Sequence, residues 1–156
     1  MVAQKDTSGF SIRNKRAWVE FHILEKFEAG LELTGTETKS LRSRNCSFTD
    51  AYVTIRGSQA FVENLHIGEY SFAGRFNHDP KRRRRLLLHR SELRSLIGKI
   101  QRQGLTLVPL AIYPKGRWLK LEIGLAKGKK HYDKREDLAK RDSDREVRRA
   151  LKVSRK

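Results

Sequence analysis

Apolar residues that alternate with polar ones fill most of the first 126 positions of this 156-residue sequence, and the alternation ends at Ala126. In the segment 118–126, for example, every second residue from Leu119 to Leu125 is apolar. Side chains of a β-strand point alternately to its two faces, so this pattern predicts strands with one buried face. The chain is therefore expected to fold around a β-sheet core that ends near Ala126.

Turn signals divide the β-prone segments into three predicted hairpins. A helix is predicted over residues 91–103, because apolar residues recur there at i, i+3, i+4 and i+7 and Gly104 follows as a stop signal. A shorter segment, 38–44, is compatible with a helix. The hairpins join 17–27 to 31–33 through Ala29-Gly30, 52–56 to 59–65 through Gly57-Ser58, and 105–113 to 118–126 through residues 114–117.

Six short strands with one long helix predict a mainly β fold. We expect an OB-like closed antiparallel barrel of about six strands with flanking helices and a disordered basic C-terminal tail. A two-layer α+β sandwich would give nearly the same pattern and remains an alternative. The length suits one core, so residues 1–126 are expected to form a single domain.

The tail, residues 127–156, differs sharply from this core. It contains 13 Lys or Arg residues and 6 Asp or Glu residues, a net charge of +7. Low hydrophobicity with high charge predicts disorder in isolation. The stretch 135–153 contains no Gly or Pro, and Val147 and Leu151 lie four residues apart. We therefore expect this stretch to become helical once an anionic partner neutralises it.

The charge of the whole chain indicates the class of partner. It has 35 Lys or Arg residues against 18 Asp or Glu residues, a formal net charge of +17. Nucleic acid is favoured over a membrane surface, because no amphipathic helix sets Trp or Phe opposite its cations. No apolar run is long enough for a signal peptide or a membrane span, so we expect a cytoplasmic protein without a membrane partner.

Catalytic chemistry has little support in the sequence. The five histidines are scattered, and no metalloprotease motif, P-loop, dinucleotide fingerprint or nucleophile elbow occurs. A single cysteine, Cys46, excludes an intrachain disulfide and a Cys-rich zinc site. We expect no metal, no cofactor and no enzymatic activity; an enzyme such as a nuclease is the weaker hypothesis.

Three segments combine cations with other phosphate-binding groups. The densest is the basic run 81–85, which precedes three leucines and is expected to present phosphate contacts on a rigid element. Segment 14–16 adds an Asn to two cations, and segment 38–44 adds hydroxyl groups to three. His89 and Tyr132 are candidates for stacking on splayed bases.

Seven segments, in order along the chain, resemble the SmpB family, the SsrA-binding proteins of bacterial trans-translation. The resemblance extends from about Asn14 to Arg149. The segments are Asn14-Lys15-Arg16-Ala17, Phe27-Glu28-Ala29-Gly30, Gly35-Thr36-Glu37-Thr38-Lys39-Ser40-Leu41-Arg42, His78-Asp79-Pro80, Leu86-Leu87-Leu88, Val108-Pro109-Leu110 and Ala126-Lys127-Gly128-Lys129-Lys130-His131-Tyr132-Asp133-Lys134-Arg135.

The resemblance implies an OB-like barrel that binds the tRNA-like domain of transfer-messenger RNA (SsrA). It implies delivery of the alanyl form of this RNA, with elongation factor Tu and GTP, to stalled ribosomes for rescue and peptide tagging. The tail would enter the empty messenger channel near the small-subunit decoding centre and become helical there. A generic OB-type RNA-binding or ribosomal protein is the alternative.

The resemblance also assigns residues. Glu28, Leu87 and His89 fall in segments that the family uses for its RNA interface, and the motif 133–135 serves the ribosomal step. Thr38 and Arg85 depart from the usual valine and lysine at their positions, and Arg85 keeps the charge with a different geometry. His89 occupies a position where asparagine also occurs in the family.

Two sets of candidate residues follow from the residue patterns and the resemblance together. The RNA-binding set is Asn14, Lys15, Arg16, Glu28, Lys39, Ser40, Arg42, Lys81, Arg82, Arg83, Arg84, Arg85, Leu87 and His89. The ribosome-binding tail set is Lys127, Lys129, Lys130, His131, Tyr132, Asp133, Lys134 and Arg135.

Overall fold

The computed structural model describes residues 10–153, and within the last helix it leaves the side chains of residues 131–133 undescribed. The first nine residues of the predicted core and the last three of the tail therefore lie outside it. The elements in chain order are β1 (Ile12–Arg13), α1 (Lys15–Glu20), β2 (Phe21–Leu31), α2 (Gly35–Arg42), β3 (Cys46–Ser47), β4 (Tyr52–Arg56), β5 (Gln59–Glu63), β6 (His66–Ile67), the 3₁₀ turn η1 (Gly74–Phe76), β7 (Arg84–Leu87), α3 (Arg90–Gln103), β8 (Thr106–Lys115), β9 (Trp118–Gly128) and α4 (His131–Val153).

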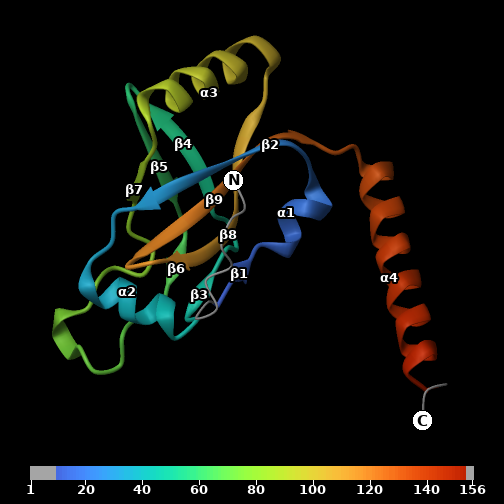
Figure 1. The fold of residues 1–156 in the computed structure, drawn as a ribbon, viewed down its shortest axis with the longest axis horizontal. Coiled ribbons are helices and arrows are strands. Elements are labelled where there is room, and N and C mark those ends of the chain that lie inside the picture. Colours follow the sequence, from blue (N-terminus) through green and yellow to red (C-terminus); the bar gives the residue numbers. More distant parts are fainter. Residues whose placement is uncertain (1–9, 154–156) are drawn as a thin grey trace.

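Within the described part of the chain, seven strands form one antiparallel sheet in the order β1-β8-β4-β5-β7-β2-β9. Strand β8 also pairs with β9, so the pairing that leaves β8 returns to it through five other strands, β4, β5, β7, β2 and β9. Helix α3 lies across one end of the sheet, α2 lies at the other end, and α1 and α4 lie to one side (Figure 1). The prediction of a mainly β antiparallel fold with flanking helices is confirmed.

Two predicted hairpins and the long helix are present. Strands β4 and β5 pair through the two-residue turn at Gly57, whose φ of 61° is left-handed, and β8 pairs with β9 from Lys115 and Trp118 inward. Helix α3 ends at Gly104, which has a φ of 62° and donates its N–H to the Ile100 carbonyl. These elements form as predicted because their turn residues and apolar periods are local signals.

The first predicted hairpin is wrong. Residues 15–20 form helix α1, and β2 then runs without a turn from Phe21 to Leu31. Gly30 lies inside this strand, where a Cβ would stand 3.2 Å from the Leu87 Cβ. Glycine therefore serves a close approach between strands here, not a turn. A register shift between Ile23 and Glu25 also breaks the simple alternation along β2.

Strand β7, which links β2 to β5, is absent from the sequence prediction. Its residues alternate strictly: Arg84 and Leu86 are buried, whereas Arg85 and Leu87 are exposed. An arginine at an inward position hides the usual alternation of apolar and polar residues. The basic run is therefore partly a strand of the sheet.

The apolar side of the sheet and the inner faces of α2 and α3 form one core. Leu41 on α2, Leu96 on α3 and Ile112, Leu121 and Ile123 on the β8–β9 hairpin have 0% exposure. Fully burying one such side chain contributes about 1.5–3 kcal/mol. The core thus holds the two helices against opposite ends of the sheet.

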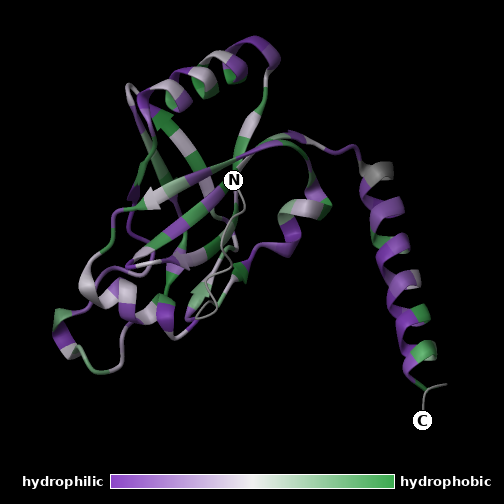
Figure 2. Cartoon of the chain, viewed as in Figure 1, coloured by the Kyte–Doolittle hydropathy of each residue, from purple (hydrophilic) through white to green (hydrophobic). Residues whose placement is uncertain are grey.

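Helix α4 extends away from this core (Figure 1) and is largely hydrophilic along its length (Figure 2). It begins at His131, four residues before the stretch predicted to be helical, and β9 continues to Gly128, two residues past the predicted core. Val147 and Leu151 are each 58% exposed. Of the helices in the described residues, none is long and apolar enough to cross a membrane.

Candidate nucleic-acid interface

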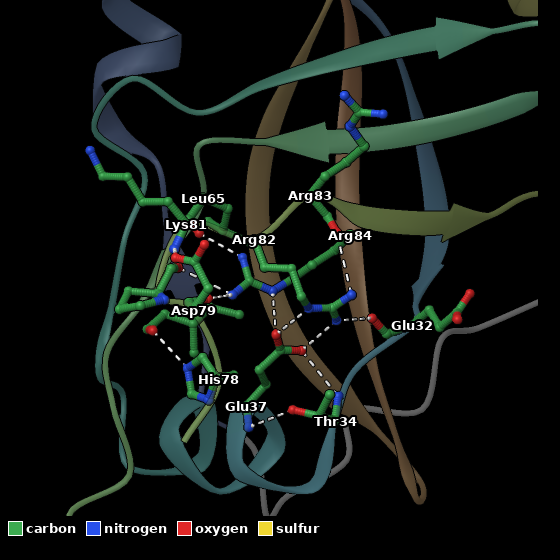
Figure 3. A network of polar contacts seen from close by, with 12 residues as sticks. Glu32, Thr34, Glu37, Leu65, His78, Asp79, Lys81, Arg82, Arg83 and Arg84 are labelled. Atoms are coloured by element: carbon green, nitrogen blue, oxygen red, sulfur yellow. Dashed lines mark hydrogen bonds and ion pairs between the residues drawn. The ribbon is translucent and has the colours of Figure 1, made fainter. Parts of the chain in front are cut away.

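The basic run 81–85 is divided by one buried carboxylate, that of Glu37 on α2. Arg82 donates to both carboxylate oxygens of Glu37, from Nε at 2.8 Å and from Nη2 at 2.9 Å. Arg84 Nε lies 3.1 Å from Glu37 Oε1, an ion pair without the alignment of a hydrogen bond. Arg84 also donates to the Leu65 carbonyl at 2.7 Å. In Figure 3, Arg82 and Arg84 turn toward Glu37, whereas Lys81 and Arg83 point away.

Local sequence explains why Glu37 stands there. Thr34 caps α2: its Oγ1 accepts from the Glu37 N–H, and Glu37 Oε2 accepts from the Thr34 N–H at 3.0 Å. Burial alone would raise the pKa of Glu37, but hydrogen bonds from Arg82 and Thr34 and the charge of Arg84 hold its pKa below the ordinary value. The Thr-x-x-Glu spacing was a readable capping signal in the sequence, but its arginine partners were not.

Two predicted phosphate contacts are therefore wrong in this structure. Arg84 has 0% exposure and Ser40 has 1%, so neither side chain reaches solvent. The Ser40 hydroxyl instead donates to the Gly68 carbonyl. Arg82 is 38% exposed at its side chain, but Glu37 occupies the Nε–Nη2 edge of its guanidinium, and Nη1 donates to the Arg83 carbonyl at 3.3 Å. Lys81, Arg83 and Arg85 remain exposed.

Glu28 lies on the outer face of β2 and is held by the β8–β9 hairpin. Its carboxylate accepts hydrogen bonds from the Tyr113 hydroxyl and, at 2.9 Å, from Lys115 Nζ. Partial burial would raise the pKa of Glu28, but these two hydrogen bonds hold its pKa below the ordinary value. Glu28 is therefore an anionic anchor for a tyrosine and a lysine on the outer face.

Two predicted residues lie at the C-terminal end of β7, which pairs with the end of β2, and two others lie on α2 at the opposite end of the sheet from α3. Leu87 is 48% exposed at the end of β7, and His89, also exposed, precedes α3. The Glu92 carboxylate accepts from the His89 backbone N–H at 3.3 Å. On α2, Lys39 and Arg42 are exposed, and Lys39 Nζ lies 5.3 Å from the centre of the Tyr70 ring.

Residues 14–16 lie elsewhere: Asn14 is the N-cap of α1, and Lys15 and Arg16 are its first two residues. Helix α1 lies to one side of the sheet (Figure 1). The Asn14 side chain donates to the Pro109 carbonyl at 2.8 Å, so it fastens α1 to β8. Arg16 pairs with Glu20 one turn later at 2.7 Å, and Lys15 is exposed. The predicted RNA-binding set is thus split between two surfaces.

The tail residues also separate. Lys127, Lys130 and Arg135 are exposed and Lys134 is half-buried. Lys129 is only 9% exposed at its side chain, because Nζ donates to the Trp18 carbonyl at 3.1 Å and to the Asp137 carboxylate. The expectation that Lys129 faces an external partner is therefore wrong in this structure. The side chains of His131, Tyr132 and Asp133 lie outside the described residues.

Sequence reasoning missed a further group on the outer sheet face. Lys120 on β9 pairs with Gly30 on β2 and with Tyr113 on β8, and Trp118 on β9 pairs with Lys115 on β8. Trp118 is 69% exposed. The only signal for it in the sequence was an aromatic beside cations in a turn, which becomes meaningful once the strands are paired.

No catalytic constellation emerges from the described residues. Among the described side chains, which leave out those of residues 131–133, no group of three or more His, Cys, Asp or Glu could hold a metal ion. Burial raises the pKa of the Cys46 thiol to about 12, so it stays protonated and is a poor nucleophile.

Fold and surface together define a small, strongly basic antiparallel β-protein that exposes cations both around α2 and β7 and along α4. Residues 11–153 match the family model described as SmpB protein, and the chain belongs to the SmpB family.

Similar proteins agree with this assignment. A protein of Carboxydothermus hydrogenoformans named SsrA-binding protein is 50% identical over 140 residues, covering 90% of this chain and 94% of its own length. The SsrA-binding protein of Trichodesmium erythraeum is 49% identical over 154 residues, covering 97% and 99%. A solved structure described as "tmRNA-SmpB: a journey to the center of the bacterial ribosome" matches with a TM-score of 0.66 and 43% identity, covering 82% of this chain and 94% of that one.

Proposed function

We propose that this chain binds the tRNA-like domain of transfer-messenger RNA (SsrA) and is required to deliver it to stalled ribosomes for rescue and peptide tagging. Membership of the SmpB family, with relatives named SsrA-binding proteins, supports this function. The observation that carries it is the separation of two exposed basic surfaces, one around α2 and β7 and one along α4. One protein can then hold one RNA while it engages another.

The core is proposed to be a closed OB-like barrel. Pairing of β8 with both β4 and β9 supports closure, since the ladder of strands then has no free end between them. Such a barrel would hold the outer faces of β2, β7 and β9 in fixed positions, as recognition of structured RNA requires.

The core interface is proposed to use Lys39, Arg42, Lys81, Arg83 and Arg85, all of which are exposed. Affinity should fall with salt, with a log–log slope of roughly −0.7 to −0.9 per phosphate neutralised. Equal binding to unrelated RNA hairpins at physiological salt would contradict selective recognition.

Glu28 is proposed to position Lys115 and Tyr113 for the RNA and not to contact a phosphate itself. Glu28→Ala should weaken RNA binding while thermal unfolding hardly changes, because the carboxylate is partly exposed. Glu28→Gln, which keeps an acceptor for Tyr113, is the matched control and should lose less. A shift in unfolding without a change in binding would make Glu28 structural.

The tail is proposed to serve the ribosomal step alone, disordered in isolation and helical in the messenger channel. Exposed Lys127, Lys130 and Arg135 support contact with ribosomal phosphates. We further propose that the alanyl transfer-messenger RNA associates with elongation factor Tu and GTP, that the protein has no catalytic activity of its own, and that the cytoplasm, where ribosomes work, is its compartment.

The test separates the two surfaces. A chain that ends at Lys130 retains all of β9 and the Lys129 N–H bond to the Glu20 carbonyl. It should bind transfer-messenger RNA almost as tightly as the full chain but add no tag to stalled peptides. Replacing residues 133–135 by Ala should reproduce the tagging loss. A proline at Val147 should do so in part, at a helix cost of about 3 kcal/mol.

Two results would contradict this division. Full tagging by the truncated chain would remove the tail from the ribosomal step. Loss of RNA binding on truncation would place the tail in the recognition surface. A defect in ribosome assembly in place of rescue would favour the alternative, a structural ribosomal protein.

A further inference from the structure

A groove of about 470 Å³ lies on the outer face where β7, β2 and β9 run side by side. Its apolar walls include Leu87, which is 48% exposed, and Trp118, which is 69% exposed. Its remaining lining includes two cations, Arg117 and Lys120, and one carboxylate, Glu32. A large exposed indole beside an open apolar groove marks a binding surface.

Strand register explains the groove. Gly30 on β2 pairs directly with Leu87 on β7 and with Lys120 on β9, so these three positions share one face. Because Gly30 has no side chain, the Leu87 side chain leans across it, with its Cδ1 3.5 Å from where a Cβ would stand. The result is an apolar floor between a leucine and a lysine.

The tryptophan and the cations occupy the other side of the groove. Trp118 pairs with Lys115 across the β8–β9 hairpin, and Arg117 lies in the turn itself. Lys120, two residues after Trp118 on β9, pairs with Tyr113 on β8. An exposed aromatic face is therefore bordered by positive charge, which suits a flat, uncharged ring attached to a phosphate backbone.

We propose that this groove binds one unstacked base of the RNA, with Trp118 as the stacking surface and with Arg117 and Lys120 on the flanking phosphates. Leu87, on the opposite wall, contacts the edge of the base. The inference rests on the proposed function, because it assigns a specific subsite to the RNA that the core binds. A protein partner is disfavoured, since the groove would then leave its cations without matching anions.

The chain offers an internal control, because its only two tryptophans are Trp18 and Trp118. Trp18 lies on α1, is 38% exposed and already contacts Lys26 Nζ at 4.8 Å from its ring centre. Trp18→Phe leaves Trp118 as the sole indole, and Trp118→Phe leaves Trp18. In titrations with a transcript of the tRNA-like domain, the Trp118 emission should be quenched and the Trp18 emission should stay unchanged.

Affinity provides the second measurement. Stacking of one base on an aromatic side chain contributes to the binding affinity, and its loss in Trp118→Ala should weaken RNA binding roughly 5- to 150-fold. Trp118→Phe should recover part of this loss because a ring remains, whereas Trp18→Ala should bind within about twofold of the unmodified chain. Thermal unfolding of each variant shows that an affinity loss is not a folding loss.

The outcomes are distinct. If the unmodified chain binds the tRNA-like domain selectively but Trp118 is neither quenched nor needed, the base site is overturned and the proposed function stands. If the unmodified chain has no preference for this RNA over an unrelated hairpin at equal salt, both fail. A Trp118 signal that appears with ribosomal proteins and not with RNA also overturns the base site.

Discussion

The two basic segments of this chain, 81–85 and 127–135, look alike in the sequence but differ in the structure. In the first, β7 turns alternate side chains inward, so Arg84 is buried on Glu37 while Arg83 and Arg85 face solvent. In the second, most described cations are exposed, and Lys129 alone among them is drawn to the core. Two features decide which cations a partner can reach: the position of a neighbouring carboxylate, and the alternation of side chains between the two faces of a strand.

The carboxylates themselves differ between the segments. Glu37 has 0% exposure and neutralises two arginines, so its charge supports the fold. Asp137 is 39% exposed at its side chain and meets Lys129 at the edge of the core. A buried pair is costly to break from one side, whereas an exposed pair is screened by water. The following predictions test this contrast.

Glu37→Ala should have the largest effect on stability. It leaves Arg84 charged and buried without its partner, so the free energy of unfolding should fall by about 3–5 kcal/mol. Denaturant unfolding measures this change. The control is Asp137→Ala in the tail, which should leave global unfolding nearly unchanged. Similar effects from both substitutions would remove the distinction between the two segments.

The pH dependence of stability should report the same buried pair. The pKa of Glu37 is lowered in the folded state, so its contribution is complete above its ordinary value of 4.5 and is lost as the pH falls through the folded pKa. Unfolding measured between pH 6 and pH 3 should therefore decline more steeply for the unmodified chain than for Glu37→Gln. Parallel curves would show that the neighbours of Glu37 do not lower its pKa in the folded state.

Arg85→Gln should weaken RNA binding without destabilising the fold. Arg85 is exposed beside buried Arg84, so the substitution removes a phosphate contact and should reduce the salt slope by about 0.7–0.9. Arg84→Gln serves as its matched control. Because Arg84 is buried, this substitution should lower the free energy of unfolding, while the RNA affinity of the folded protein should keep the same dependence on salt. An Arg85→Gln variant with the original slope would take Arg85 out of the interface.

Asp137→Asn should produce the smallest, most local change. The carboxylate of Asp137 accepts from Lys129, so its loss should loosen the first turns of α4 against α1. Hydrogen exchange should become faster at the described amides of residues 134–140 and stay unchanged in β8 and β9. Unchanged exchange in α4 would mean that the Trp18 carbonyl alone holds Lys129.

The sequence by itself determined the elements whose signals are local. The β4–β5 and β8–β9 hairpins follow from alternation and from the turn signals at 57–58 and 114–117, and α3 follows from its apolar period and Gly104. The family resemblance also directed attention to Glu28, Leu87 and His89. Each hairpin and helix signal depends on residues a few positions apart, so a short segment contains the whole of it.

Only the tertiary structure decided which candidates face a partner. The sequence predicts a turn at Gly30, but in the structure the Leu87 Cβ lies 3.2 Å from where a Gly30 Cβ would stand. The sequence also predicts a phosphate contact for Arg84, but the structure places Glu37, 47 positions earlier, beside it. Trp118 gains its groove only when β2, β7 and β9 are side by side. Burial and pairing between distant residues are set by how strands meet in space, and that information is spread over the whole chain.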